Sequence, residues 1–239
     1  MTPERMWISL LTARAFTLVE MLTVVAVVAV LAALAVPVMQ RAMVAARQQG
    51  CASNMRQIGA AICLYAADND GWMPGTTHTE TLRNSWIETL RPYLANCDKV
   101  RISPGDPKGA QRLKAGGSSY ILNSFVFVPR IGPFGETLPG TLNRLSRIPR
   151  PTETLLAANI SDQQGASAQN DHTHSDLWGG NWTRLCADIQ PDRFTTAPKP
   201  DHSRGSANYL FADGHVSELQ AADVKARLER GDNIAQPPL

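Results

Sequence analysis

The stretch Ala15-Phe16-Thr17-Leu18-Val19-Glu20, followed by an apolar run from Met21 to Met39, decides the fold of this chain. Thr23 and Pro37 are the only residues of the run that are not plainly apolar. An α-helix rises about 1.5 Å per residue, so a helix over residues 16–40 has about the length needed to cross a hydrocarbon core of about 30 Å. The sequence therefore predicts a membrane-spanning helix.

Glu20 is the anomaly of this segment, because it places an ionisable carboxylate just inside the apolar run. Burying a carboxylate in lipid costs roughly 3 kcal/mol unless it finds a partner. A helix terminus or a cation is therefore implied. The plain alternative is that Glu20 lies at the headgroup level of an ordinary anchor and extends its side chain to water.

The segment Phe16-Thr17-Leu18-Val19-Glu20, after a short Arg-bearing leader over residues 1–15, resembles the N-terminal signature of type IV prepilins and type II secretion pseudopilins. The resemblance implies that a prepilin peptidase/N-methyltransferase cuts between Ala15 and Phe16 and methylates the new amino group. It also implies that Glu20 neutralises the N-terminus of a neighbouring pilin-like subunit. Two helices packed in lipid would need such a pair, since each charge would otherwise be buried alone. Ala15 stands where the family usually has Gly.

A secretory signal peptide with Ala33-Leu34-Ala35 as its cleavage site is a rival interpretation. Glu20 early in the apolar region, and the length of the run, argue against it. Arginines on the two sides of the span roughly balance, so charge does not set its orientation. The resemblance implies a single-pass protein of the inner (cytoplasmic) membrane, with its C-terminal domain outside the cytoplasm or assembled in a surface or periplasmic fibre.

Composition predicts one soluble domain over residues 41–239 of the 239-residue chain. The chain has 23 Lys and Arg against 21 Asp and Glu, and this near balance gives no sign of a nucleic-acid partner. The 44% of hydrophobic residues argues against disorder. No cofactor is predicted.

The helix is expected to continue beyond Pro37 over residues 41–68, giving one nearly continuous helix from about residue 16 to residue 68. Apolar residues recur there at three- and four-residue spacing, which indicates an amphipathic helix laid on a core: Cys51, Met55, Ile58, Ile62 and Tyr65. Asp68-Asn69-Asp70-Gly71 is expected to end the helix, with Gly71 in the left-handed position.

Two apolar runs, 118–128 and 153–160, predict strands, and residues 86–94 predict a short helix broken by Pro92. Asp213-Gly214 lies between apolar residues and predicts a tight two-residue turn in a terminal hairpin over residues 208–219. We therefore expect an α+β, pilin-like fold in which the long N-terminal helix packs on a small antiparallel sheet.

A second resemblance rests on residues 51–59 and on Tyr65 to Pro74. These are similar to a bacterial pseudopilin-like family whose C-terminal hallmark is a His, nine residues, then Asp-Gly. His202 would be the hallmark His, although ten residues separate it from Asp213. We expect structural roles in the hairpin for His202, Asp213 and Gly214, and no catalytic dyad, because no nucleophile motif accompanies them.

His172, His174 and Asp176 are the most metal-like cluster, since two His residues with a nearby carboxylate can converge on one cation. They stand in a Gly-, Asn- and Gln-rich stretch, 163–181, that is typical of an exposed insertion. No metal site is therefore predicted, and these residues remain only weak candidates.

The four cysteines form no C-x-x-C pair, which gives no support to a zinc ribbon or a thioredoxin-like centre. Cys51 and Cys63 lie too far apart along one helix to bridge each other. A Cys97–Cys186 disulfide and four small buried hydrophobes both remain open.

Assembly rather than catalysis is the function that the sequence predicts: a structural subunit of a pilus-like or type II secretion fibre. The alternative is a membrane-tethered extracytoplasmic enzyme or metal-binding domain that uses the region of His172, His174 and His202.

Overall fold

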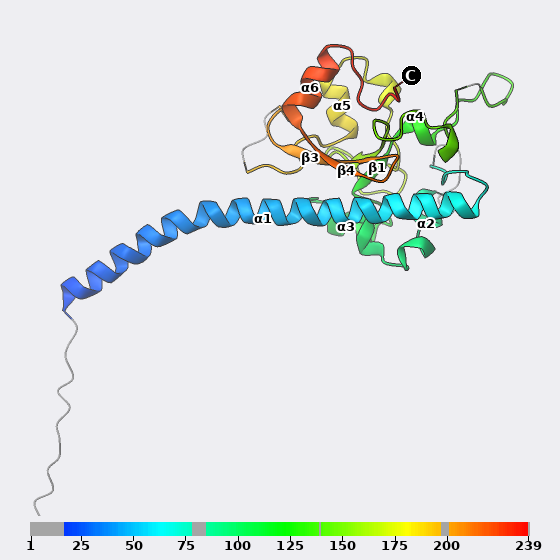
Figure 1. Cartoon of the computed structure of the whole chain (residues 1–239). Coiled ribbons are helices and arrows are strands. Elements are labelled where there is room, and N and C mark those ends of the chain that lie inside the picture. The colour runs from blue at the N-terminus through cyan, green and yellow to red at the C-terminus, as the bar shows by residue number, and fades with distance from the viewer. Residues whose placement is uncertain (1–16, 78–84, 139, 197–200, 239) are drawn as a thin grey trace, which may run out of the picture. The chain divides into compact units, whose positions relative to one another are not determined.

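The computed structural model describes residues 17–77, 85–138, 140–196 and 201–238 (Figure 1). The chain forms two compact units, residues 1–41 and residues 42–239, which we call the N-terminal unit and the globular unit. Helix α1 (Leu18–Asp68) contributes residues to both. The predicted continuous helix is confirmed from Leu18 onward, while Phe16 lies outside the described residues.

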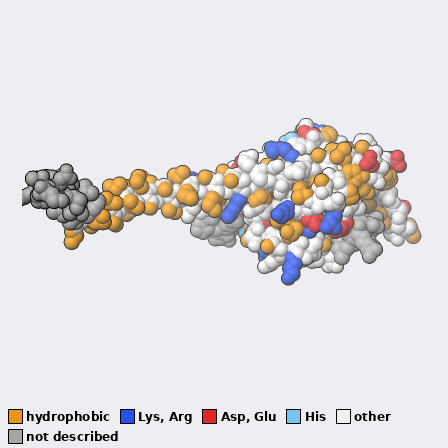
Figure 2. Space-filling view, turned by 90° about the horizontal axis from the view of Figure 1, so that it is seen from below, with side chains coloured by type: hydrophobic (Ala, Val, Ile, Leu, Met, Phe, Trp, Pro, Cys, Tyr) orange, Lys and Arg blue, Asp and Glu red, His pale blue; other side chains and the backbone are white. Residues whose placement is uncertain are grey.

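The N-terminal unit consists, in its described part, of the first half of α1. Every described side chain up to Met43 is exposed, including the large apolar ones. Apolar side chains dominate the surface of this part in Figure 2. Helix α1 is long and apolar enough to cross a membrane, and Pro37 lies inside it without ending it.

Helix α1 ends where the sequence predicted. Gly71 adopts a φ of +80°, and its N–H donates a 2.8 Å hydrogen bond to the carbonyl of Ala66. The preceding residue, Asp70, is also left-handed. A left-handed residue after the last turn satisfies carbonyls that the helix leaves without a partner, so this sequence is a helix stop.

One four-stranded antiparallel sheet forms the middle of the globular unit, with the strands in chain order. Its strands are β1 (Tyr120–Leu122), β2 (Leu155–Asn159), β3 (Ser206–Phe211) and β4 (Val216–Gln220). The predicted strand 153–160 and the terminal hairpin are confirmed. An α+β fold with one long helix and a small antiparallel sheet is therefore established.

Short helices occupy the connections. They are α2 (Trp86–Thr89), η2 (Pro92–Leu94), η3 (Asp98–Arg101), α3 (Gly109–Lys114), α4 (Ser124–Phe127), η4 (Leu145–Arg147), η5 (Ser175–Leu177), α5 (Trp182–Asp188) and α6 (Ala221–Glu229). The break at Pro92 is confirmed, because α2 ends before it and η2 begins at it.

The predicted strand over residues 118–128 is wrong beyond Leu122. Asn123 caps α4 instead: its side chain accepts a 3.1 Å hydrogen bond from the backbone N–H of Phe125. A side-chain cap of this kind offers the backbone an alternative to a sheet ladder. It prevails here over the strand preference of the β-branched and aromatic residues that follow.

Each face of the sheet carries its own core. The second half of α1 covers one face, where Met55, Ile58 and Ile62 share a buried cluster with Leu156 and Leu210. Helices α5 and α6 cover the other face (Figure 1), in a cluster that includes Ile121, Leu155, Tyr209, Leu185, Val224 and Leu228. Neighbouring strand residues point to opposite faces, so β1 and β2 contribute to both clusters.

The stretch 163–181 is only in part the exposed insertion that its composition indicated: residues 163–170 are exposed or half-buried, but several residues of 171–178 are buried. Asp171, Thr173, Ser175 and Trp178 are all buried. The reason is backbone pairing at the edge of β1: Leu122 donates to the carbonyl of Asp171 at 2.9 Å and accepts from the N–H of Thr173 at 2.8 Å. These bonds extend the sheet in parallel fashion beside β1.

Candidate functional site

The N-terminal end of α1 is the first candidate site. Oε2 of Glu20 accepts hydrogen bonds from the backbone N–H and the hydroxyl of Thr17, both 2.8 Å long. The N–H of Glu20 donates back to Oγ1 of Thr17 at 3.2 Å. This is a capping box, in which the residue before the helix and the third helical residue satisfy each other's N–H groups. Within one chain, Glu20 therefore has a helix terminus as its partner.

The position of Glu20 in the sequence implied a helix terminus or a cation as its partner, and the structure identifies Thr17 at the helix terminus. The signal was present, because Thr17-Leu18-Val19-Glu20 has the T-x-x-E spacing of a capping box directly before an apolar run. Ala15 and Phe16, the predicted cleavage and methylation residues, lie outside the described residues.

Asp213 and Gly214 lie in the turn of the β3–β4 hairpin, but the turn has three residues rather than two. Leu210 pairs with Val216, and the Phe211 N–H donates to the carbonyl of His215 at 2.9 Å. Gly214 alone in this turn has a positive φ, +88°. A two-residue type I′ turn needs two such residues, whereas a three-residue turn needs one, usually Gly.

His202 lies before β3 and not in the hairpin. Its Nδ1 is 3.2 Å from Oδ2 of the buried Asp192 and 3.1 Å from Nε2 of Gln190. Asp213 instead contacts His215, whose Nδ1 is 2.6 Å from Oδ1 of Asp213. The structure therefore places the two hallmark-like residues in separate hydrogen-bond networks.

His172 and His174 lie side by side, with ring centroids 5.2 Å apart. Nδ1 of His172 is 2.8 Å from the buried carboxylate of Asp171, which also accepts hydrogen bonds from Thr77. The more exposed His174 has its Nδ1 3.8 Å from Asp188. Among the described residues, no group of three or more His, Cys, Asp or Glu side chains is arranged to hold a metal ion.

All four cysteines are free thiols, so the Cys97–Cys186 disulfide that the sequence left open is not formed. Cys51 and Cys186 are buried, and Cys97 is exposed. Burial, with the nearby carboxylates of Asp192 and Asp201, raises the pKa of Cys186 to about 12. The description as small buried hydrophobes therefore fits Cys51 and Cys186, but not Cys97.

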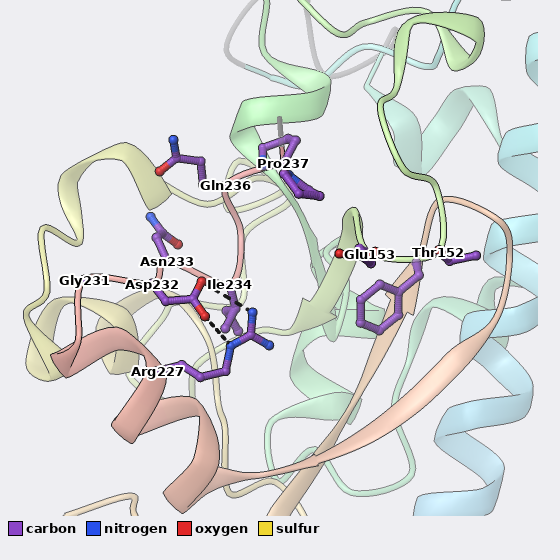
Figure 3. Close-up of a pocket in the computed structure, with 11 residues that line it drawn as sticks. Thr152, Glu153, Arg227, Gly231, Asp232, Asn233, Ile234, Gln236 and Pro237 are labelled. Carbon is purple, nitrogen blue, oxygen red and sulfur yellow. Dashed lines mark hydrogen bonds and ion pairs between the residues drawn. The ribbon is translucent and has the colours of Figure 1, made fainter.

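Four cavities in the globular unit, with volumes of about 480, 560, 590 and 380 Å³, are large enough for a small ligand. One, of about 480 Å³, lies between the β3–β4 hairpin, α6 and the C-terminal segment. Figure 3 shows Arg227 and Asp232 facing each other on one side of it, with Thr152 and Glu153 on the other. Nε of Arg227 is 2.7 Å from Oδ2 of Asp232, and Glu153 forms an ion pair with Arg150. The charged side chains that line this cavity therefore already have partners.

A second cavity has a volume of about 560 Å³ and includes His172, His174 and Asp176 in its lining. These three residues are the weak metal candidates of the sequence. The structure brings them to one cavity whose remaining walls are mostly apolar. It also adds Arg130, which sequence reasoning missed because nothing in its local sequence distinguishes it from other surface arginines.

The chain was compared with family models, with curated proteins and with solved structures, and none of them matches it.

Proposed function

We propose that this protein is a pilin-like structural subunit, processed by a prepilin peptidase and assembled through α1 into a pilus-like or type II secretion fibre. The observation that carries the proposal is the position of Glu20, a carboxylate in the first turn of a helix whose following residues are apolar and exposed. Exposed apolar side chains along a helix of this length require lipid or other helices around them.

The hydrogen-bonding state of Glu20 is compatible with such an assembly. Both bonds from Thr17 end on Oε2, and within the described residues no donor reaches Oε1. A cation from a second chain can therefore bind Oε1 without breaking the cap. In the proposed fibre this cation is the methylated α-amino group of Phe16 in a neighbouring subunit, and the pair neutralises two charges that lipid would otherwise leave unpaired.

The globular unit fits a structural role. Its two cores lie on the two faces of a single sheet, and the second half of α1 is part of one of them. A subunit of this kind presents a folded domain on a helix that packs with other helices. We propose the inner membrane as its site of insertion, with the globular unit outside the cytoplasm.

The catalytic alternative has less support. His172 is bonded to Asp171 and His202 to Asp192, so these histidines belong to different networks. An enzyme would need them, or one of them with a nucleophile, at one reacting centre.

N-terminal mass spectrometry of the protein purified from membranes tests the proposal. The mature chain is expected to begin at N-methylated Phe16. A mature terminus after Ala35, or an intact Met1, would overturn it. A Phe16→Ala variant serves as the reference, because the substitution changes the residue at the new N-terminus. The mass of the processed N-terminal peptide is then expected to differ from that of the parent by the difference between Phe and Ala.

A further inference from the structure

The cavity of about 560 Å³ lies between α4, residues 128–130 and 140–142, η5 and the C-terminal segment; we call it the Arg130 cleft. Seven apolar side chains form most of its wall: Phe125, Val128, Pro129, Leu142, Pro149, Leu177 and Pro237. Its volume falls within the range of clefts that bind small ligands, about 300–1,000 Å³. Water in a cleft with such walls is readily displaced by an apolar ligand.

The apolar character of this region continues outside the cleft. Leu177, which lines it, is 57% exposed, and Ile131, next to Arg130 in the chain, is 52% exposed. Large apolar side chains gathered at a concave site are typical of a binding surface. These positions therefore favour a ligand with apolar groups.

Two opposite charges lie in the lining, Arg130 and Asp176. Neither side chain has an ion pair or a hydrogen bond within the described residues. The cavity in Figure 3 differs in this respect, because its Arg227 and Asp232 pair with each other. The Arg130 cleft thus offers one cation and one anion to a ligand, and they come from different elements, since Arg130 follows α4 and Asp176 lies in η5.

We propose that the Arg130 cleft binds a short peptide with apolar side chains and free termini. The guanidinium of Arg130 binds the terminal carboxylate, and the carboxylate of Asp176 binds the terminal ammonium group. Apolar side chains of the peptide occupy the wall formed by Phe125, Leu142 and Leu177, next to the exposed ring of His174. This inference does not depend on assembly through α1, because every residue it uses belongs to the globular unit.

Equilibrium dialysis measures the binding of radiolabelled trileucine to the full chain in lipid nanodiscs. The binding to empty nanodiscs is subtracted. Saturable binding to the parent is expected. N-acetyl-trileucine amide, which lacks both terminal charges, and triglycine, which lacks the apolar side chains, are each expected to bind at least about tenfold more weakly.

Variants assign the charges. Arg130→Gln and Asp176→Asn are each expected to weaken trileucine binding about tenfold. The matched controls are Arg147→Gln and Asp70→Asn, which remove the same charges from exposed positions outside the cleft. Asn is well tolerated at Asp70 because this residue is left-handed.

Changes to the ligand test the same two contacts independently of the single-variant losses. Arg130→Gln is expected to bind trileucine and its C-terminal amide equally, while Asp176→Asn still discriminates between them. Any of three results overturns the proposal: no saturable binding of trileucine up to about 1 mM, equal binding of the doubly capped peptide by the parent, or equal losses in the cleft variants and their controls.

Discussion

Oε2 of Glu20 accepts both the backbone N–H and the hydroxyl of Thr17, at 2.8 Å each, while Oε1 receives no donor within the described residues. The same side chain can therefore cap its own helix and bind a cation from another chain. These two roles are separable by substitution, because they depend on different properties of the residue. The cap needs an acceptor, whereas the pair needs a negative charge.

Glu20→Gln is expected to abolish assembly while leaving the capping box in place, because Gln fits the third helical position of a capping box but carries no charge. Breaking one partner of a buried charge pair costs about 3–5 kcal/mol. Glu20→Ala removes both roles and is also expected to fail, while Thr17→Val removes part of the cap and is expected to assemble. The measurement is the amount of sedimentable fibre at equal membrane levels of protein. Normal fibre from Glu20→Gln would show that the charge is not used.

Asp106→Asn is expected to destabilise the globular unit by about 3–5 kcal/mol. Nε of Arg112 lies 2.9 Å from Oδ2 of Asp106, and neither side chain is exposed. Burial lowers the pKa of Arg112 and Asp106 opposes that shift, so removing the carboxylate leaves a cation inside the fold. Denaturant unfolding, followed by tryptophan fluorescence, measures the change.

The control for Asp106 is Glu153→Gln, which breaks the exposed pair with Arg150. Exposed ion pairs contribute about 0–1 kcal/mol, so this variant is expected to unfold close to the parent. Equal losses in the two variants would contradict a special role for the buried pair.

Gly214→Ala is expected to cost about 1–2 kcal/mol, because Gly214 has a φ of +88° and an L residue with a Cβ is strained there. The site itself is open, with no atom within 4 Å of an added Cβ, so the strain lies in the backbone alone. Gly214→Asn should cost less, since Asn tolerates this region. Thermal unfolding compares the three proteins, and a larger loss for Asn than for Ala would contradict this account.

Iodoacetamide at pH 8 is expected to label Cys97 and to leave Cys186 unlabelled in the folded protein. Cys97 is exposed, while burial raises the pKa of Cys186 to about 12, and only the thiolate reacts. Peptide mass mapping before and after unfolding measures the labelling. Rapid modification of Cys186 in the folded state would show that its environment is open.

The same pKa shift has a pH-dependent consequence for stability. The unfolded thiol ionises above about pH 8.5, while the folded thiol stays protonated until about pH 12. The unfolded state therefore binds fewer protons between these values, and the free energy of unfolding falls as the pH rises. Cys186→Ala should reduce this fall, which urea titrations at pH 8 and pH 10 would measure.

Hydrophobic periodicity predicted those parts of the fold in which no second local sequence pattern favoured a different structure. Met55, Ile58 and Ile62 recur at helical spacing and do form the buried face of α1. The strand at 155–159 and the stop at Gly71 are likewise local. In contrast, Asn123 sits inside an apolar run, and whether its side chain caps a helix depends on the surroundings that fix its conformation.

Long-range pairing explains the larger errors. The polar composition around Asp171 indicated an exposed segment, but the backbone of this segment is hydrogen-bonded to Leu122. No local sequence pattern predicts such a pairing at the edge of a sheet. For the same reason, sequence spacing put His202 with Asp213, whereas the fold places it beside Asp192. The Arg130 cleft combines four separate segments, so only the structure brings its two charges together.

The contact between α1 and β3 also has a consequence for the order in which the chain can fold. Nδ2 of Asn208 donates a 2.7 Å hydrogen bond to the carbonyl of Gln48, a residue 160 positions earlier. At about 5–20 residues per second, a ribosome needs about 8–32 seconds to make that interval. Met55, Ile58 and Ile62 therefore emerge long before Leu210, which covers them. During synthesis the apolar face of this helix is therefore exposed until β3 has been made.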